Sequence, residues 1–448
     1  MIQERLLEKI TDRTMTVGII GLGYVGLPLA IAFSSAGYKV VGFDIDKNKV
    51  KQLNAGQSYI IDISEDKLKL AIAEGFIATT DFSILSEMDA ISICVPTPLT
   101  KAQTPDTSYI ESAVSQINQF KRQGQLIVLE STTYPGTTEE LIEQVFKQEG
   151  YQVGLDYFLC FSPERVDPGN PIYNTQNTPK VIGGTTENCT LLGKSLYEKV
   201  IPNMVSVSSP KVAEMSKLIE NTFRSINIAF VNELAMLSDT IDVDVWESIE
   251  AASTKPFGFM KFQPGPGIGG HCIPLDPMYL SWKAKESNFY SSFIDLAQEI
   301  NRLMPGVVCE KASEALNSVQ KSLNGSRVLL LGVAYKSDID DVRESPALEV
   351  YELLREKGAL VSVCDPFVPK FRDRTGNMVQ TIYTSDVKFA LYDLVILLTP
   401  HQSLDLQAIA LDSQLILDTK NAFQEIANDK IFVMGKMAKK KRLPVSIH

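Results

Sequence analysis

The sequence predicts an α/β protein with two doubly wound sheet domains joined by a long-helix central region. Apolar segments of strand length alternate with helical patterns over residues 14–165 and again after residue 327. Two long helical patterns, at residues 209–239 and 293–323, lie between these regions. A chain of 448 residues is too long for one ordinary core. We therefore expect three domains, at residues 1–208, 209–323 and 324–448.

Composition and charge argue against several classes of protein. Hydrophobic residues make up 44% and charged residues 22% of the chain, as in soluble globular proteins. The net charge of −11 does not suggest a nucleic-acid surface, and the basic run at residues 436–442 is interpreted as a solvated end. No apolar run reaches the roughly 18 residues of a membrane span, so no membrane partner is expected. Residues 1–13 mix charges with apolar positions and lack the core of a signal peptide.

The cysteines and histidines are too dispersed to suggest a disulfide framework or a metal site. The six cysteines form no C-x-x-C pair, which favours reduced thiols and a cytoplasmic location. With three histidines in the chain, we expect no bound metal.

A glycine motif opens the first α/β region. The apolar strand predicted at residues 14–20 runs into GLGYVG at residues 21–26, which includes Tyr24 and Val25. An apolar helix follows, and the next strand ends at Asp44, eighteen residues after the last glycine of the motif. Strand, G-x-G-x-x-G turn, helix, strand and carboxylate together make the dinucleotide fingerprint of a Rossmann-like domain.

Each residue of this fingerprint has a physical role. Gly21 makes the turn, Gly23 lets a pyrophosphate approach the backbone, and Gly26 lets the helix pack on the strand. The N-terminus of the helix then faces the phosphates. Asp44 can accept hydrogen bonds from ribose hydroxyls and would repel a 2′-phosphate. The expected cofactor is therefore NAD.

Polar residues follow the next strands of this domain. Thr97, Thr132 and the pair Glu164–Arg165 each come directly after a predicted buried strand. Ligands of open α/β sheets bind beyond the carboxyl ends of the strands, so these side chains are candidates for the site. A threonine there is commonly a helix cap, and a charged pair is equally well a structural ion pair.

The central region carries two further candidates. Lys217 and Asn221 are four residues apart and share one face of a long helix with apolar neighbours. Such a lysine requires an anionic partner, unless it extends to the surface. Residues 265–277, GPGIGGHCIPLDP, cannot be a helix interior or a central strand, so we expect a loop of specified shape. It presents Cys272 as a candidate nucleophile beside His271 and Asp276.

The last third repeats the α/β pattern without a G-x-G-x-x-G. We interpret it as a smaller Rossmann-like domain that closes over the ligand and does not bind a full dinucleotide. Lys336 and Arg343 follow its first strand and could meet phosphate or carboxylate. Nearby aspartates, among them Asp341, could equally pair with them.

A nicotinamide site combined with a reactive cysteine favours oxidation at the aldehyde level. The thiol can trap an aldehyde as a thiohemiacetal, which loses a second hydride to give a thioester that water cleaves. A hydroxy-acid dehydrogenase would not need the cysteine loop.

At this point the chain closely resembles the UDP-glucose/GDP-mannose dehydrogenase family over nearly its whole length. The segments that carry the resemblance are GLGYVGLPLA, VPTPL, STTYPGTT, FSPERVDPGNP, SKLIENTFRSINIAFVNE, FQPGPGIGGHCIPLDP and GVAYKSDIDDVRESPA. The resemblance implies two NAD-binding-type domains joined by a helical core, through which such enzymes usually dimerise. It also implies a four-electron oxidation of a nucleotide-sugar C6 alcohol to a carboxylate with two NAD per turnover.

The resemblance also implies residue roles. Cys272 matches the nucleophile, Lys217 the lysine that stabilises oxyanions, and Asn221 its partner. Asp276 and Thr132 match residues that hold or polarise water, and Glu164 matches a glutamate that acts in thioester hydrolysis. The positions that match cofactor contacts are Gly21, Gly23, Tyr24, Val25, Gly26, Asp44, Thr97 and Thr132. The positions that match substrate contacts are Glu164, Arg165, Lys217, Asn221, Phe262, Pro264, Gly265, Gly267, Gly269, Lys336 and Arg343.

Two departures indicate the sugar. UDP-glucose enzymes typically read G-G-S-C-x-P-K-D and P-E-F-L-x-E, whereas this chain reads GGHCIPLD and PERVDPG. Pro168 stands where the second glutamate would be, and Asp167 is adjacent but not equivalent. These features resemble the branch that acts on UDP-N-acetylhexosamines. DPMYLSWKAKE and NRLMP resemble UDP-N-acetyl-D-glucosamine 6-dehydrogenases, whose uronic acid products serve surface polysaccharide synthesis.

Alternatives remain open at this point. UDP-N-acetyl-D-mannosamine, UDP-N-acetylgalactosamine or UDP-glucose could be the substrate, because no spacing argument reaches the stereochemistry at C2. A non-catalytic NAD-sensing protein is a more remote alternative.

Overall fold

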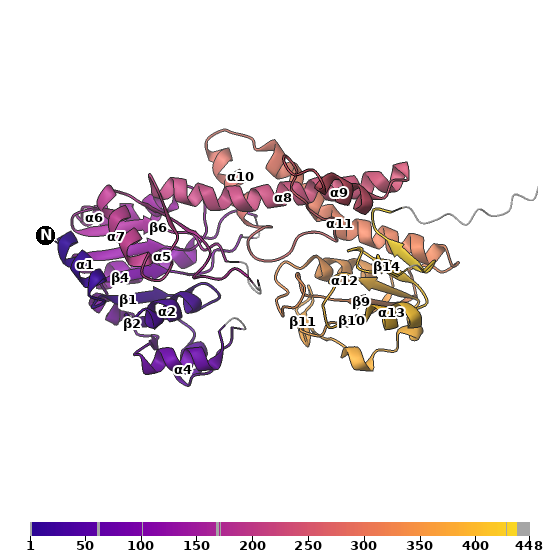
Figure 1. Cartoon of the computed structure of the whole chain (residues 1–448), viewed down its shortest axis with the longest axis horizontal. Coiled ribbons are helices and arrows are strands. Elements are labelled where there is room, and N and C mark those ends of the chain that lie inside the picture. Colours follow the sequence, from indigo (N-terminus) through magenta and orange to yellow (C-terminus); the bar gives the residue numbers. More distant parts are fainter. Residues whose placement is uncertain are drawn as a thin grey trace, which may run out of the picture. The chain divides into compact units, whose positions relative to one another are not determined.

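The computed structural model describes residues 2–60, 63–100, 102–166, 170, 172–426 and 428–436 (Figure 1). The chain forms two compact units, one of Met1–Glu220 with Met278–Phe289 and one of Asn221–Pro277 with Tyr290–His448. Helix α8, Pro210–Ile241, begins in the first unit and ends in the second. The domain bounds after residues 208 and 323 stay predictions. Asp167, Pro168 and residues 437–442 of the basic run lie outside the described residues.

The first unit is built on an eight-stranded sheet in the order β3-β2-β1-β4-β5-β6-β7-β8. All neighbouring strands are parallel except β6 and β7, which pair antiparallel. Its strands are β1 Thr16–Ile20, β2 Lys39–Phe43, β3 Ile77–Thr79, β4 Ala90–Ile93, β5 Gln125–Leu129, β6 Tyr157–Phe161, β7 Lys180–Gly184 and β8 Met204–Val207. Strands β4, β5 and β6 are buried throughout, as expected for a sheet covered on both faces.

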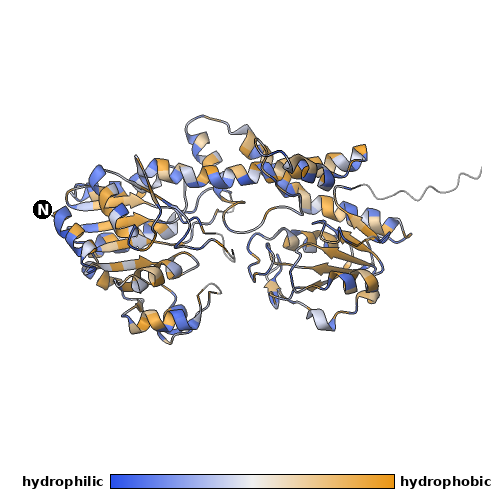
Figure 2. Ribbon diagram, in the orientation of Figure 1, coloured by the Kyte–Doolittle hydropathy of each residue, from blue (hydrophilic) through white to orange (hydrophobic). Residues whose placement is uncertain are grey.

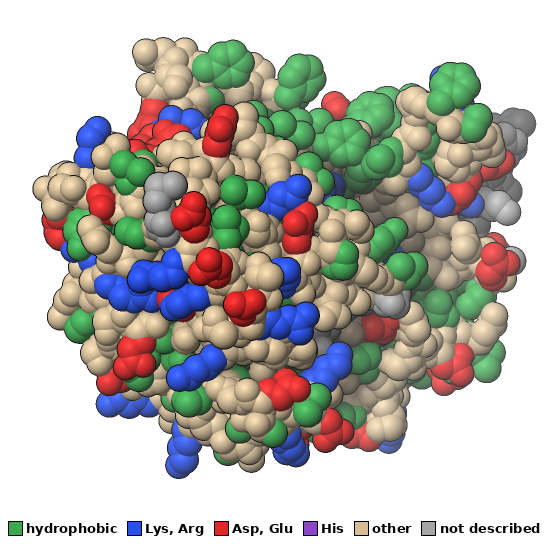
Figure 3. All heavy atoms as spheres, turned by 60° about the vertical axis from the view of Figure 1, so that its left-hand side comes forward, with side chains coloured by type: hydrophobic (Ala, Val, Ile, Leu, Met, Phe, Trp, Pro, Cys, Tyr) green, Lys and Arg blue, Asp and Glu red, His purple; other side chains and the backbone are tan. Residues whose placement is uncertain are grey.

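Helices cover both faces of this sheet. One apolar core joins the sheet to side chains of α1, α2 and α7, and a second core joins it to α5, η2 and α6. The helical segments are α1 Ile2–Thr11, α2 Gly26–Ser35, α3 Lys47–Asn54, α4 Glu65–Ala73, η1 Phe82–Glu87, α5 Ser108–Phe120, η2 Thr138–Glu143, α6 Gln144–Gln148, α7 Glu187–Tyr197 and α10 Asp276–Glu286. On the face shown in Figure 3, acidic and basic side chains are interspersed.

The second unit holds a five-stranded parallel sheet in the order β10-β9-β13-β14-β15, and a separate hairpin of β11 and β12. Its strands are β9 Arg327–Leu331, β10 Leu360–Cys364, β11 Lys370–Arg372, β12 Met378–Gln380, β13 Leu394–Leu397, β14 Ile416–Asp418 and β15 Ile431–Val433. Its further helical segments are α9 Val245–Ser253, α11 Ser292–Asn317, α12 Pro346–Glu356, η3 Thr384–Asp386, η4 Phe389–Leu391 and α13 Leu406–Asp412. The strands of both sheets are strongly hydrophobic, as Figure 2 shows.

These sheets confirm the predicted α/β class, with two local corrections. Helix α11 ends at Asn317 and not at residue 323, because the backbone of Gln320 turns into the left-handed region. The loop predicted over residues 265–277 ends earlier, because Asp276 and Pro277 form the first turn of α10. Proline is well tolerated there, since its missing N–H has no partner in a first turn. Among the described residues, no helix combines the length and the hydropathy needed to cross a membrane.

Helix α1 is anchored to the first sheet through Asp89, which is 2% exposed. The carboxylate accepts hydrogen bonds from Lys9 Nζ at 2.7 and 2.9 Å, from Thr16 N at 3.1 Å and from Arg122 Nη2 at 2.5 Å. Burial raises the pKa of Asp89, but these donors outweigh it and hold the pKa below its ordinary value. The carboxylate is therefore ionised at neutral pH, and it links Lys9 on α1 to the first residue of β1.

We expect the substitution Asp89→Asn to lower the free energy of unfolding by about 1.5–3 kcal/mol at pH 7, the range for hydrogen bonds to a charged group. Because the folded pKa of Asp89 lies below the unfolded value of about 4, its stabilisation is complete above that value and disappears as the pH falls through the folded pKa. Urea unfolding of both proteins at a series of pH values checks this, with the exposed Asp12→Asn as the matched control. A difference that stays constant down to pH 3 would contradict the assignment.

Candidate active site

The turn after β1 has the geometry of a pyrophosphate cradle. Gly21 has a φ of +90°, in the left-handed region that favours glycine. A Cβ on Gly26 would clash with the carbonyl oxygen of Gly21, so glycine is required where α2 starts. A Cβ on Gly23 would meet no heavy atom within 4 Å, and the first turn of α2 holds no acidic residue. Open space beside an uncompensated helix N-terminus fits the phosphates of NAD.

Asp44 lies at the end of β2 with its carboxylate oriented by backbone donors. Oδ2 accepts from Leu22 N at 3.1 Å, and Oδ1 accepts from Asp46 N at 2.9 Å. A carboxylate has about four acceptor positions, so two remain for ribose hydroxyls. On the turn between β1 and α2, Tyr24 is exposed and Val25 is half-buried. The predicted cofactor residues from Gly21 to Asp44 therefore lie at one edge of the sheet.

The second sheet has a matching carboxylate, Asp365, whose acceptor positions are occupied. It follows β10, as Asp44 follows β2, and Gly332 after β9 has a φ of +85°. Its oxygens accept from the backbone N–H groups of Val333 at 2.7 Å, Ala334 at 3.0 Å, Phe367 at 2.8 Å and Val368 at 3.0 Å, while His401 Nε2 lies 3.2 Å from Oδ2. This carboxylate has no acceptor position left for a ribose.

The loops after β4 and β5 are joined at the carboxyl edge of the first sheet. Thr97 is 5% exposed, and its Oγ1 donates to the carbonyl oxygen of Thr132 at 2.7 Å. The hydroxyl of Tyr279 donates to the carbonyl oxygen of Thr97. The structure thus brings Thr97 and Thr132 together, and Thr97 uses its hydroxyl to hold the loop.

Helix α8 carries a row of buried polar side chains, which we call the polar stripe: Glu214, Lys217, Asn221, Ser225 and Asn232. Their spacing of three, four, four and seven residues places them on one face of the helix. Each is at most 7% exposed. Buried polar groups at this spacing are costly unless each is hydrogen-bonded or reserved for a ligand.

Members of the polar stripe hold the loops that carry other candidates. Glu214 accepts from Gly136 N at 2.5 Å and from Thr138 N at 2.9 Å, which fixes the loop after β5. In the second unit, Asn232 Oδ1 accepts from Gly265 N at 2.9 Å, and its Nδ2 donates to Asn301 at 3.0 Å.

Lys217 differs from the other members of the stripe. Its side chain is buried, so the surface alternative is wrong, yet within the described part of the chain the structure assigns its ammonium no hydrogen bond or ion pair. One turn further along α8, Asn221 Nδ2 donates to Asp276 Oδ2 at 2.5 Å, and Asp276 is 2% exposed. A buried ammonium without an assigned anion is suited to receive a negative charge from a ligand.

All six cysteines lie in the described part of the chain, and Cys272 is the one that is half-buried. The other five are buried, and burial raises the pKa of the thiols of Cys94, Cys160, Cys309 and Cys364. The carbonyl of Cys272 accepts from Asp276 N at 2.8 Å, which places this residue in the turn before α10. Accessibility therefore selects Cys272 as the candidate nucleophile. Among the described residues, no cluster of His, Cys, Asp or Glu could hold a metal ion.

The glycine-rich loop packs within the second unit against the segment after β9. Gly270 N donates to the carbonyl oxygen of Arg343 at 2.9 Å, and a Cβ on Gly269 would lie 2.5 Å from Tyr335 Cβ. Gly267 has a φ of +130°. Pro264 is buried, and the ring of Phe262 packs edge-on against Phe223 on α8. Phe262–Gly270 and the Lys336–Arg343 segment are thus brought together.

Two further basic residues belong to the second unit, as this loop does. Arg343 pairs internally with Asp341, with Nη2 2.7 Å from Oδ2, as one alternative from the sequence foresaw. Lys420, which sequence reasoning missed, follows β14 and places its Nζ where a Cβ on Gly265 would lie. Burial lowers the pKa of Lys420 to about 8, against the opposing effect of Asp418. The signal for Lys420 in the sequence was its position just after the apolar strand predicted in QLILDTK.

The side chains of Glu164 and Arg165 form ion pairs with other residues and not with each other. Arg165 Nη2 lies 2.6 Å from Glu220 Oε1, whereas Glu164 Oε2 lies 3.2 Å from Lys180 Nζ. Lys180 also pairs with Glu130 at 2.6 Å. Sequence reasoning missed Lys180, although a lysine that opens the apolar run KVIGG was a signal.

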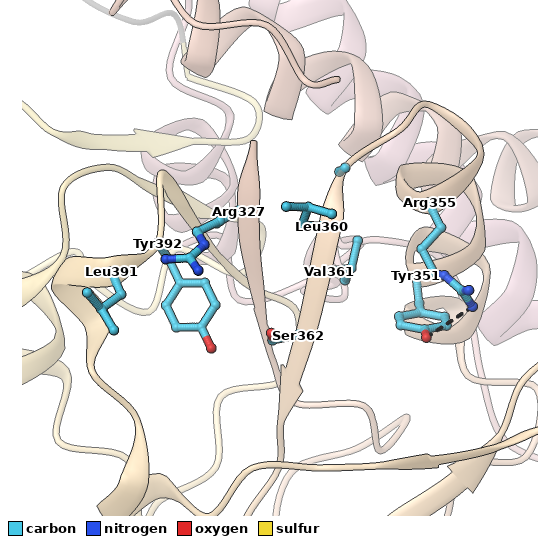
Figure 4. Close-up of a pocket in the computed structure, with 9 residues that line it drawn as sticks. Arg327, Tyr351, Arg355, Leu360, Val361, Ser362, Leu391 and Tyr392 are labelled. Atoms are coloured by element: carbon cyan, nitrogen blue, oxygen red, sulfur yellow. Dashed lines mark hydrogen bonds between the residues drawn. The ribbon is translucent and has the colours of Figure 1, made fainter. Parts of the chain in front are cut away.

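A cavity of about 540 Å³ lies elsewhere in the second unit (Figure 4). It is lined by Arg327 and Leu360, the first residues of β9 and β10, by Tyr392 before β13, and by Tyr351 and Arg355 on α12. These are the amino ends of the strands, opposite to the carboxyl ends where α/β sheets bind ligands. The cavity is therefore separate from the candidate residues that follow β9.

Comparison with known proteins places these features in a family. Three models of the UDP-glucose/GDP-mannose dehydrogenase family match the chain: the NAD binding domain at residues 15–201, the central domain at 211–303 and the UDP binding domain at 329–425. These matches confirm the predicted family and the predicted NAD cofactor.

Similar proteins span nearly the whole chain. The UDP-N-acetyl-D-mannosamine dehydrogenase of Pyrococcus horikoshii is 35% identical over 418 residues, which cover 92% of this chain and 96% of that protein. The UDP-N-acetyl-D-glucosamine 6-dehydrogenase of Salmonella typhi is 33% identical over 412 residues, with 90% and 95% covered. A solved structure of the Pyrococcus horikoshii mannosamine enzyme matches with a TM-score of 0.86 at 33% identity, covering 94% of this chain and 99% of that one.

The two glycines of the cradle give a matched pair of substitutions. We expect Gly23→Ala to leave the melting temperature unchanged and to weaken NAD binding at least tenfold, because its Cβ fills only the space meant for the pyrophosphate. Gly26→Ala should also lower the melting temperature, because its Cβ meets the backbone of Gly21. Calorimetric titration with NAD and thermal melts measure both effects. Unaltered NAD affinity in Gly23→Ala would refute the cradle.

Proposed function

The chain belongs to the UDP-glucose/GDP-mannose dehydrogenase family, and on that premise we propose that it oxidises the C6 alcohol of a UDP-N-acetylhexosamine to the carboxylate. It is an NAD-dependent UDP-sugar dehydrogenase, like its relatives. The observation that carries the proposed mechanism is the buried Lys217 ammonium, to which the structure assigns no anion among the residues it describes. It lies one helical turn from Asn221, which is hydrogen-bonded to Asp276.

Bound NAD supplies the hydride acceptor, and the residues of the turn after β1 hold it. In the first oxidation, Asp276 takes the proton of the C6 hydroxyl, directly or through water, while Asn221 fixes the orientation of its carboxylate. The ammonium of Lys217 stabilises the negative charge that develops on the sugar oxygen. Such a donor is most effective where burial has removed water, as it has at Lys217.

Cys272 makes the second oxidation and the release of an acid possible. Its sulfur adds to the aldehyde carbon to form a thiohemiacetal, and loss of the second hydride leaves a thioester. Water then attacks the thioester carbon near Thr132 and Glu164, the C–S bond breaks, and the carboxylate leaves. The half-buried position of Cys272 supports this role, since the other thiols are closed off by burial.

For the sugar, UDP-N-acetyl-D-glucosamine is our first candidate, on the motifs HCIPLDP, DPMYLSWKAKE and NRLMP. UDP-N-acetyl-D-mannosamine is the second, favoured by the name of the Pyrococcus horikoshii relative at 35% identity. Both substrates present the same C6 alcohol and diphosphate, so the residues above serve either. The product would be a uronic acid precursor for surface polysaccharide.

A homodimer is part of this proposal. Beyond residue 220, α8 exposes Phe223, Phe230, Leu237 and Ile241, with exposed fractions of 45–56%. Their spacing of seven, seven and four residues gives a continuous apolar row of the kind that pairs helices. The row supports association through the central helix, as the family resemblance implies.

Initial rates on four UDP-sugars test the function and the choice of sugar. We expect kcat/KM for UDP-N-acetyl-D-glucosamine to exceed that for UDP-glucose at least 100-fold, and to exceed that for the mannosamine and galactosamine isomers. Preference for the mannosamine isomer would keep the reaction and replace the substrate. NADH formation from none of the four would favour the non-catalytic NAD-binding alternative.

A further inference from the structure

We propose that Lys180 is a positioning residue for the hydrolytic half of the reaction, because it fixes the carboxylate of Glu164 in the orientation in which it acts on the thioester. This inference rests on the proposed function, since it takes Glu164 as the residue beside the attacking water. Lys180 is the first residue of β7 and is 3% exposed.

The ammonium of Lys180 has all of its donor capacity engaged inside the protein. Its Nζ donates to Glu130 Oε2 at 2.6 Å, to the carbonyl oxygen of Pro163 at 3.1 Å and to Glu164 Oε2 at 3.2 Å. An ammonium has three N–H donors, so these three acceptors use them all. Lys180 therefore acts through Glu164 and not on a ligand directly.

Glu130 holds Lys180 from the interior of the sheet. This glutamate follows β5 and is 1% exposed, and its Oε1 accepts from the hydroxyl of Tyr197 on α7 at 2.5 Å. The Tyr197 hydroxyl also lies 2.9 Å from the hydroxyl of Ser92 on β4. The ammonium is thus held through a chain of hydrogen bonds that involves Glu130 after β5, Tyr197 on α7 and Ser92 on β4. Its second ion pair is with Glu164, whose side chain is 15% exposed.

Glu164 is held by three donors in total. Its Oε1 accepts from the backbone N–H groups of Arg165 and Val166, both at 2.9 Å, and its Oε2 accepts from Lys180. Of about four acceptor positions on a carboxylate, one is left. A single remaining position gives a defined direction to a hydrogen bond from water, and Lys180 is the side chain that defines it.

The two glutamates that pair with Lys180 have pKa values shifted in opposite directions. Burial raises the pKa of Glu164, but Lys180 and the two backbone donors outweigh it, so the pKa lies below its ordinary value. Burial raises the pKa of Glu130, and Lys180 offsets this only in part. The other titratable groups that face the cluster, Cys94 and Tyr197, have raised pKa values because of burial and stay neutral. At neutral pH Glu164 is ionised and able to receive a proton.

The chemistry of the step balances without a further reactant. The oxygen of water bonds to the thioester carbon, one water proton passes to Glu164, and the C–S bond breaks with its electron pair on Cys272. The second water proton stays on the new carboxyl group, which releases it to solvent as the carboxylate forms. The thiolate then recovers the proton from Glu164. A low pKa on Glu164 favours this return, since the carboxylate is the more stable form.

The test is a Lys180→Met variant of the full-length protein, with Lys194→Met on α7 as the matched control, since Lys194 is partly exposed. Rapid mixing with NAD and UDP-N-acetyl-D-glucosamine, or the sugar preferred in the rate panel, followed by acid quench and intact-mass analysis, measures the acyl adduct on Cys272. We expect adduct accumulation and a hydrolysis rate reduced about 10- to 100-fold, the loss typical of a misplaced reacting group. The acid limb of the hydrolysis rate should move to higher pH, because Glu164 loses the positive charge that keeps it ionised.

Two further variants make each outcome decisive. Lys180→Met with Glu130→Gln removes both buried charges, and it replaces the single variant if an unpaired Glu130 prevents folding. Hydrolysis at the wild-type rate with an unshifted acid limb, in whichever variant folds, would overturn the inference. Glu164→Gln should accumulate the same adduct. If this variant and the wild type form no adduct at all, the proposed function fails, and the inference fails with it.

Discussion

The burial of polar side chains along one face of α8 is the constraint on which the candidate site depends. A buried polar group is costly unless it has a hydrogen-bond partner or is reserved for a ligand. Glu214 finds backbone N–H groups of the loop after β5, Asn221 finds Asp276, and Asn232 finds Gly265. These bonds hold the loops in defined shapes. Lys217 is buried on the same face, and among the described residues the structure assigns its ammonium no anionic partner.

The two sheets use one structural pattern for different purposes. In both, a glycine with positive φ follows the first strand and an aspartate follows its neighbour. Asp44 accepts two backbone hydrogen bonds and keeps capacity for a ribose, whereas Asp365 is saturated by four backbone donors and His401. In the second sheet the aspartate therefore has no acceptor position for the ribose of a dinucleotide, although the backbone follows the same pattern. A UDP binding domain, as the family model describes it, does not require that capacity.

Local features of the sequence predicted much of this structure. The glycine turn and Asp44 were predictable because a strand, a turn and a helix impose their geometry within thirty residues. The placement of Thr97 beside Thr132 followed from the rule that parallel strands end at one edge. The ion pairs of Lys180 were not predictable, since its partners Glu130 and Glu164 meet it only after strands distant in the sequence pair with one another. The sequence allowed Arg343 either to pair with a neighbouring aspartate or to meet a ligand; the structure shows the pair with Asp341, and the ligand contact stays a prediction.

We propose that a sugar alcohol passes through two oxidations by way of Cys272. The most direct test is the amount of NADH formed per UDP-sugar consumed, measured with limiting sugar on the wild type and on Cys272→Ser. We expect two NADH and a uronic acid from the wild type, and no net turnover to the acid from the variant, which should still bind the sugar. One NADH per sugar with accumulated aldehyde, or undiminished NADH production by the variant, would contradict it.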